Sequence, residues 1–96
     1  MGRGQPPLLE LFTRAGCGVC DRAARLIERE ARGATVRTID VDTDPELVRR
    51  YGVRVPVIRV DGVEVAELEV APGEVRRALR AARRAARRTE RHAGRS

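Results

Sequence analysis

Ninety-six residues suffice for one small domain with a modest hydrophobic core. Two cysteines cannot form the disulfide-dense framework of a small secreted protein, and no stretch approaches the roughly 20 apolar residues of a membrane-spanning helix. The N-terminus also lacks the apolar segment of a signal peptide. We therefore expect a cytoplasmic protein without membrane association, whose thiols are reduced except during turnover.

The formal net charge of +6 is unevenly distributed along the chain. Residues 1–75 carry 11 Arg against 13 Asp or Glu, a net charge of −2, whereas residues 76–96 carry 9 Arg against one Glu, a net charge of +8. The basic character therefore belongs to the C-terminal segment, and the rest of the chain is slightly acidic.

The first predicted elements are a strand, a helix and a second strand. The apolar run LLELFTR, residues 8–14, is typical of a short buried strand. Apolar residues then recur at helical spacing from Cys17 until Gly33, a typical helix stop. Residues 34–42, ATVRTIDVD, are typical of a second strand. Such a unit predicts a right-handed crossover between parallel strands.

A short second helix is predicted to end near Tyr51. Its start has two alternative signals: Thr43 with Glu46 fits a capping box, and Asp44 before Pro45 fits a cap followed by proline in the first turn. The sequence does not decide which of these two side chains forms the cap.

Residues 55–68 predict a β-hairpin, with Asp61 and Gly62 as a two-residue type I′ turn. Counting outward from the turn gives the expected register: Val60 opposite Val63, Arg59 opposite Glu64, and Ile58 opposite Val65. A last helix is predicted from about Glu74 to Thr89. The predicted order is β-α-β-α-β-β-α, an α/β chain with a four-stranded mixed sheet flanked by helices.

Cys17 and Cys20 lie at the predicted join of the first strand and the first helix. Such a pair can be a reversible dithiol, part of a metal site or a structural disulfide. A disulfide that closes so small a loop would stabilise little. A zinc site needs four ligands, and the chain adds only His92, in its tail. Reversible dithiol chemistry is favoured, although a metal cluster shared between two chains stays open.

This arrangement resembles the glutaredoxin branch of the thioredoxin-like fold over residues 8–82. LFTRAGCGVC is similar to that family's strand, loop and active-site motif, and YGVRVP is similar to its approach to the cis-proline loop. The resemblance implies a glutaredoxin-like domain at 8–82, after a flexible leader at 1–7 and before an Arg/Ala-rich helical extension and tail at 83–96.

The resemblance also implies a thiol–disulfide oxidoreductase that serves cell redox homeostasis and electron transfer. Its partners would be a disulfide-containing protein or a low-molecular-weight thiol. No cofactor is expected beyond the redox-active Cys17–Cys20 disulfide, no metal is expected, and the chain is expected to be a monomer.

Cys17 is the expected nucleophile, because free N–H groups and the helix dipole at a helix start favour a thiolate. Cys20, one turn further on, is the expected resolving thiol. Arg14 is either a cation that lowers the pKa of Cys17 further, in addition to the helix start, or a solvated loop charge. Asp21 could oppose ionisation of Cys20 or accept its proton.

The expected substrate-binding residues are Arg14, Gly18, Val19, Val55 and Pro56. The resemblance implies a cis bond between Val55 and Pro56 and a backbone at Val55 that pairs with an extended substrate segment. Phe12 and Tyr51 are interpreted as core residues rather than substrate stackers.

One departure from the family follows the hairpin. Where glutathione-binding members have a Gly-Gly turn, residues 66–69 are Ala-Glu-Leu-Glu. The loss of close backbone approach to a ligand carboxylate, together with two like charges, argues against specific glutathione binding.

Arginine recurs on one face of the predicted last helix, and alanine fills the other face. Beyond Ala82 an alanine-only face buries little, so this end is expected to project into water. A solvated extension is the simpler interpretation, and docking of RNA or an acidic protein is the alternative, although no aromatic residue is present there to stack on bases. A non-catalytic adaptor or redox sensor that acts through this tail is the alternative to an enzyme.

Overall fold

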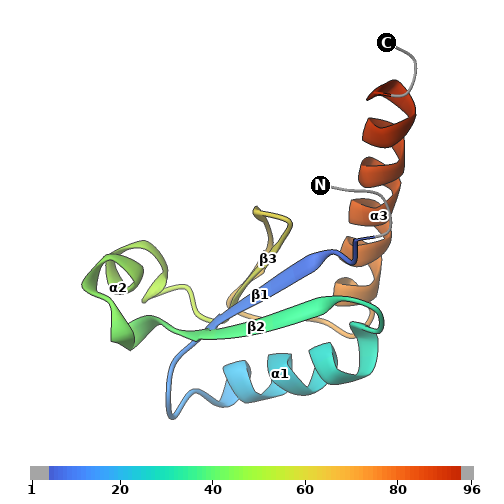
Figure 1. Ribbon diagram of the computed structural model, residues 1–96. Coiled ribbons are helices and arrows are strands. Elements are labelled where there is room, and N and C mark those ends of the chain that lie inside the picture. The colour runs from blue at the N-terminus through green and yellow to red at the C-terminus, as the bar shows by residue number, and fades with distance from the viewer. Residues whose placement is uncertain (1–4, 94–96) are drawn as a thin grey trace.

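The computed structural model describes residues 5–93, with side chains as far as Arg91 (Figure 1). The elements are β1 (Leu8–Thr13), α1 (Gly18–Glu30), β2 (Thr35–Asp40), α2 (Pro45–Tyr51), β3 (Val57–Val60), β4 (Val63–Glu67) and α3 (Glu74–Ala93). The predicted order is confirmed. Within the described part of the chain, no helix is long and apolar enough to cross a membrane.

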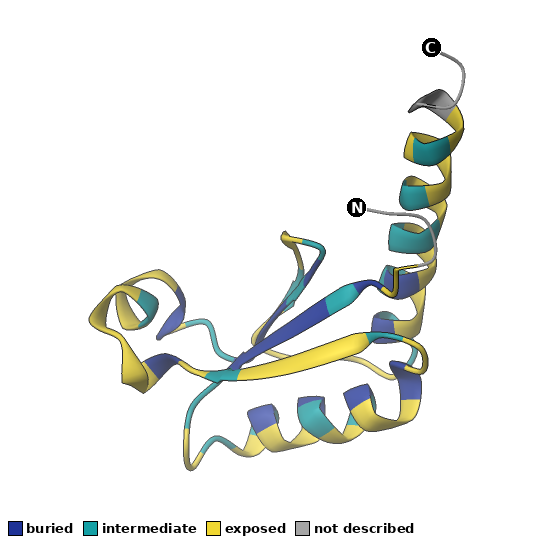
Figure 2. Cartoon of the chain, in the orientation of Figure 1, coloured by how far each residue is buried: buried dark blue, intermediate teal, exposed yellow. Residues whose placement is uncertain are grey.

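The four strands form one mixed sheet in the order β2-β1-β3-β4. β1 pairs parallel with β2 and antiparallel with β3, and β3 pairs antiparallel with β4. β1 is therefore an inner strand, and the register that places Phe12 opposite Val57 aligns its C-terminal end with the start of β3. Figure 2 shows β1 mostly buried and β2 mostly exposed.

Alternate side chains of β1 enter two different apolar clusters, as the two faces of a pleated strand require. On one face, Leu9 and Leu11 pack against α1 and α3. On the other face, Phe12 packs with Tyr51, and the two rings are stacked with centroids 4.2 Å apart. Phe12 and Tyr51 are 3% and 1% exposed, so their prediction as core residues is confirmed.

A charged pair lies beside this second cluster. Glu10 is only 7% exposed, and its Oε1 accepts two N–H groups of the Arg59 guanidinium, at 3.0 and 2.8 Å. Arg59 also donates to the hydroxyl of Tyr51 at 3.0 Å. Arg59 lies opposite Glu64 in the register, as predicted, but Glu64 forms its ion pair with Arg54 at 2.8 Å.

The hairpin turn is as predicted, but part of its register is wrong. Asp61 and Gly62 both have positive φ, 50° and 84°, as a type I′ turn requires. Ile58 lies opposite Ala66 rather than Val65, because the register shifts between Ile58 and Arg59. One extra residue in β4 forms a bulge there, which counting outward from a turn cannot detect.

The second strand is shorter than predicted, since β2 ends at Asp40 and a 3₁₀ turn covers Val41–Thr43. The Asp40 carboxylate accepts the N–H of Asp42, and the Thr43 hydroxyl donates to the Asp40 carbonyl at 2.7 Å. These local bonds compete with the strand. The observed cap of α2 is Asp44, whose carboxylate accepts the N–H of Glu46 at 2.9 Å. The hydroxyl of Thr43, the alternative cap, is bonded to the Asp40 carbonyl instead.

The two ends of the chain differ in part from the prediction. In the predicted leader, residues 1–4 lie outside the described residues, whereas Pro7 is buried and its carbonyl accepts the N–H of Thr35 at 2.9 Å. At the other end, α3 continues past Thr89 to Ala93. Alanine and arginine are strong helix formers, and no glycine interrupts α3 before residue 94. Residues 94–96 of the predicted tail lie outside the described residues.

Glu30 joins the end of α1 to the start of α3. It is 9% exposed, and its two carboxylate oxygens accept the backbone N–H groups of Gly73 at 2.7 Å and of Arg76 at 3.1 Å. Burial disfavours the charged form, but these two N–H groups and the nearby guanidinium charges outweigh it and lower the pKa of Glu30. The carboxylate thereby satisfies N–H groups that a helix start leaves without partners.

Glu30→Gln is expected to lower the free energy of unfolding at neutral pH by about 1–3 kcal/mol, because charge-assisted hydrogen bonds are lost. The lowered pKa means that the carboxylate contributes its full stability above the unfolded value of 4.5 and loses it as pH falls through the lower folded value. Urea unfolding across acidic pH should therefore show a weaker pH dependence in the variant.

Glu28→Gln is the matched control, since Glu28 is an exposed residue of the same helix. It should change stability by at most about 0.5 kcal/mol. Equal losses in the two variants would contradict a junction held by Glu30.

Candidate functional site

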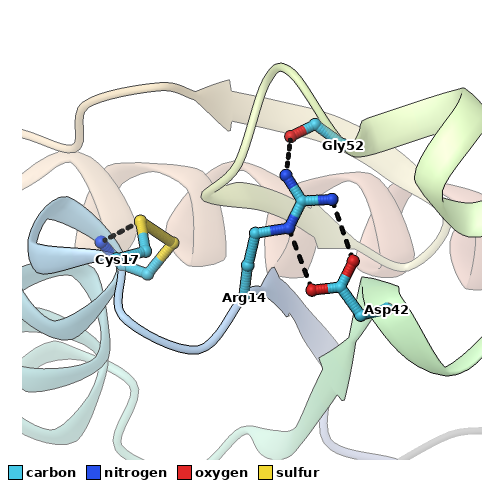
Figure 3. The surroundings of a disulfide bond; sticks show 5 residues. Arg14, Cys17, Asp42 and Gly52 are labelled. Atoms are coloured by element: carbon cyan, nitrogen blue, oxygen red, sulfur yellow. Dashed lines mark hydrogen bonds and ion pairs between the residues drawn. A yellow bond between two sulfur atoms is a disulfide. The ribbon is translucent and has the colours of Figure 1, made fainter.

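Cys17 and Cys20 form a disulfide at the start of α1, with Cα atoms 5.2 Å apart (Figure 3). Cys17 is the N-cap of the helix: its backbone is extended, and its sulfur accepts the N–H of Cys20 at 3.2 Å. Cys17 is partly exposed, whereas Cys20 is 1% exposed. The two residues therefore differ in accessibility, and of the pair only Cys17 presents a surface to a partner.

The loop between β1 and α1 sets this position. Gly16 has a φ of 74°, a left-handed conformation that glycine adopts without the steric cost of a Cβ. This turn reverses the chain after Thr13, so that α1 begins beside the C-terminal end of β1. Gly18 follows Cys17 and is exposed, with no atom within 4 Å of where a Cβ would lie. The surface beside Cys17 is therefore open.

Arg14 points toward Asp42 and the Gly52 carbonyl rather than toward the disulfide (Figure 3). Its guanidinium donates to both carboxylate oxygens of Asp42, at 3.0 and 2.9 Å, and to the Gly52 carbonyl at 3.1 Å. This hydrogen-bonded pair raises the pKa of Arg14 and lowers the pKa of Asp42. Arg14 thus ties the β1–α1 loop to the segments on either side of α2, and its role toward substrate stays a prediction.

The peptide bond between Val55 and Pro56 is cis, as the family resemblance predicted. Because β3 begins at Val57 opposite Phe12, the sheet brings residues 55 and 56 to the same end as the β1–α1 loop. Pro56 is buried, and its carbonyl accepts the N–H of Leu68 at 2.9 Å. Val55 is partly exposed, and within the described chain neither its N–H nor its carbonyl forms a hydrogen bond.

Leu68 is a residue of this region that the sequence analysis did not single out. Its φ is 69°, a left-handed conformation that is uncommon for a residue with a bulky side chain. Its N–H donates to the carbonyls of both Arg54 and Pro56, and the residue is 53% exposed. Glycine or asparagine would have signalled such a backbone, and the leucine gives no comparable signal.

A groove of about 470 Å³ lies along α1 and begins at Val19, between the two cysteines. Its lining residues are Val19, Arg22, Arg25, Leu26 and Arg29 from α1, and Glu69, Val70 and Pro72 from the loop before α3. The arginines were missed as candidate site residues, although their spacing places them on one side of a helix. Val19 is the predicted site residue that the groove includes.

The described residues contain no group of three or more His, Cys, Asp or Glu side chains that could hold a metal ion. The side chain of His92, considered above as a third ligand, lies outside the described residues.

Relatives of this chain are found both by sequence and by structure. The uncharacterized protein Rv0508 of Mycobacterium tuberculosis is 42% identical over 71 residues, which cover 67% of this chain and 73% of that protein. The structure of target protein XcR50 from X. campestris has a TM-score of 0.67 at 32% identity and covers 76% of this chain and 96% of that chain.

Two thioredoxins support the fold further. A mutant thioredoxin from Halobacterium salinarum NRC-1 has a TM-score of 0.61 at 28% identity, covering 80% of this chain and 74% of that chain. Fasciola hepatica thioredoxin has a TM-score of 0.54 at 23% identity, covering 78% of this chain and 79% of that chain. This match shows likeness of fold alone. The predicted thioredoxin-like fold is confirmed.

Residues 8–80 match the model of a glutaredoxin-like domain (DUF836), which is more than half of the chain. With the C-x-x-C disulfide at the strand–helix join and the mixed four-stranded sheet, this match identifies the protein as a member of the glutaredoxin-like family with a thioredoxin-like fold.

Proposed function

We propose that the protein is a thiol–disulfide oxidoreductase that reduces disulfides of proteins or small molecules with its Cys17–Cys20 dithiol. The observation that carries this proposal is the asymmetry of the pair: Cys17 is partly exposed and caps α1, and its disulfide partner Cys20 is buried. This difference supports Cys17 as the sulfur that meets a substrate and Cys20 as the sulfur that completes the exchange.

In the reduced protein, Cys17 is the nucleophile. A thiolate at the helix start is stabilised by the N–H of Cys20, which already points at the Cys17 sulfur at 3.2 Å, and by the helix dipole. The thiolate attacks one sulfur of the substrate disulfide, and a mixed disulfide with Cys17 forms as the other substrate sulfur leaves as a thiolate.

Cys20 then resolves the mixed disulfide. Its thiolate attacks the Cys17 sulfur, the Cys17–Cys20 disulfide forms, and the second substrate sulfur leaves as a thiolate that takes up a proton. Two electrons have passed from the dithiol to the substrate. The oxidised product of this sequence is the state observed here. Recycling requires an external low-molecular-weight thiol or a flavin-dependent reductase, in keeping with a cytoplasmic location.

Two features beside the disulfide support docking of an extended substrate segment. The N–H and carbonyl of Val55 are free of hydrogen bonds within the described chain, so they can pair with a substrate backbone. The groove that begins at Val19 is lined by apolar residues and by three arginines, which outnumber its one acidic residue, Glu69. We expect this groove to favour substrates that are acidic beside the reacting disulfide.

Cys17→Ser is expected to abolish turnover of a model disulfide such as insulin or a glutathione mixed disulfide, because the attacking thiolate is lost. Cys20→Ser should accumulate stable mixed disulfides with substrates, because the resolving thiol is lost. Reduction assays and non-reducing mass spectrometry would measure the two effects.

Ala15→Ser is the matched control, since Ala15 is exposed in the same loop and should retain full activity. Undiminished turnover in Cys17→Ser would contradict the mechanism. A wild-type protein that binds a partner without any turnover would instead identify a non-catalytic adaptor.

The Arg14–Asp42 pair makes a separate prediction for the reduced enzyme. Because Asp42 and the Gly52 carbonyl hold the Arg14 guanidinium away from the sulfur, Arg14→Gln should raise the pKa of Cys17 by less than about half a unit. Asp42→Asn should lower that pKa by a similarly small amount, because a negative charge is removed at the same distance. The rate of iodoacetamide alkylation against pH measures both shifts. A rise of about one unit or more in Arg14→Gln would show that Arg14 acts directly on the sulfur.

A further inference from the structure

The basic residues of α3 form a single surface, which we call the arginine face. At about 100° per residue, its members fall within an arc of about 140° and extend for about 22 Å along the helix. They are Arg76, Arg77, Arg80, Arg83, Arg84, Arg87, Arg88 and Arg91. All are exposed except Arg83, which is partly buried and donates to the Arg32 carbonyl at 2.9 Å.

These guanidinium groups lack the acidic partners that four arginines elsewhere in the described chain have. Arg14, Arg49, Arg54 and Arg59 form ion pairs with carboxylates. Within the described residues, no member of the arginine face forms an ion pair. The Glu30 carboxylate interacts electrostatically with Arg76 and Arg77, at the start of the face. The distal part of the face is a cluster of like charges, Arg84, Arg87, Arg88 and Arg91, that line one shallow hollow.

The arginine face lies far from the redox site. α1 begins at the disulfide, and its C-terminal end meets α3 through Glu30 (Figure 1). α3 then projects away from α1 and past the end of β1, so that its last turns lie far from the start of α1 (Figure 1). A ligand on the distal part of the face would therefore leave Cys17 accessible.

The chemistry of α3 restricts what can bind there. Within the arc every residue is arginine, so the face has no aromatic or large apolar anchor of the kind that dominates protein–protein contacts. Opposite the arc, a groove of about 450 Å³ between the β3–β4 hairpin and α3 is lined mainly by alanine and valine. Alanine beyond Ala82 gives too little apolar area for insertion into a lipid surface. A second copy of the chain docked through the same segment would bring the +8 charge of its residues 76–96 against another +8.

A regular array of phosphates matches these properties. Arginine binds phosphate oxygens through paired N–H donors and needs no apolar anchor to do so. An α-helix with side chains is about 10–12 Å across, close to the roughly 12 Å width of the major groove of B-form DNA. Without aromatic residues to stack on unpaired bases, a duplex is favoured over a single strand.

We propose that the arginine face of α3 docks on the phosphate backbone of duplex DNA, without reading its sequence. The interaction is electrostatic, since guanidinium groups replace the counterions condensed on the duplex. It is independent of disulfide exchange and places the redox site at the opposite end of α1.

The test is fluorescence anisotropy of a labelled mixed-sequence 20-base-pair duplex with the full chain, at several salt concentrations. We expect binding that weakens steeply with salt and has a dissociation constant of about 10⁻⁶ to 10⁻⁴ M at physiological salt. Replacing Arg84, Arg87, Arg88 and Arg91 by Gln should weaken binding at least about tenfold at low salt. It should also reduce the slope of log K against log salt by about 3–4, since each phosphate contact contributes about 0.9.

Two matched variants separate position from total charge. The first variant has Gln in place of Arg32, Arg37, Arg49 and Arg50. Its formal net charge falls from +6 to +2, as in the α3 variant, but it should retain most of the DNA binding. Lys at Arg84, Arg87, Arg88 and Arg91 should also retain it. Circular dichroism checks that α3 stays helical in each variant. Equal loss in the two Gln variants would overturn the proposal.

Further outcomes also decide the matter. The proposal is wrong if the wild type does not bind the duplex at low salt, or binds single strands, an acidic peptide or phosphatidylserine vesicles more tightly than the duplex. The Cys17→Ser variant should bind DNA as the wild type does, and the α3 Gln variant should reduce disulfides at the wild-type rate. Loss of one activity alone therefore shows which of the two proposals has failed.

Discussion

The structure depends on the burial of β1 on both of its faces. Its leucines pack under α1 and α3, and Phe12 stacks on Tyr51 on the opposite side of the sheet. An inner strand held in this way has one permitted register, since a shift of one residue would exchange its faces. The end of β1 is therefore fixed in space, and with it the loop that carries Cys17.

The candidate chemistry follows from what meets at this end of the sheet. α1 begins there, so the N–H of Cys20 in its first turn donates to the Cys17 sulfur. Cys20 itself is buried on the inward face of the same helix. The loop before β3 arrives at the same edge with its cis Val55–Pro56 bond. Arg14 does not act as a free charge in this arrangement, because Asp42 and the Gly52 carbonyl hold its guanidinium. In the proposed mechanism, a thiolate at Cys17 is stabilised mainly by the helix start rather than by a neighbouring cation.

The charges of the protein are divided between two structural roles. Around the sheet, some arginines are matched with carboxylates, as in the Arg59–Glu10 and Arg54–Glu64 pairs, and these contribute to the fold. Along α3 they are unmatched, although mutual repulsion disfavours such an array. The helix nevertheless persists to Ala93, since alanine and arginine have high helix propensity. The proposed redox surface and the proposed docking surface are thus joined by α1 but chemically independent.

The order of the elements, the strand–helix placement of Cys17 and the Asp61-Gly62 turn could be predicted from the sequence, because neighbouring residues carry those signals. Local pattern could not predict the bulge that places Ile58 opposite Ala66, because the hairpin alone permits either register. The partner of Arg14 is 28 residues away in the chain, and the left-handed backbone of Leu68 accompanies hydrogen bonds to two carbonyls of a preceding loop. The sequence by itself determined which segments become strands and helices and which sulfur begins a helix. Only the tertiary structure decided which charges are paired and which backbone groups stay free, because those outcomes depend on segments that meet only after the chain has folded.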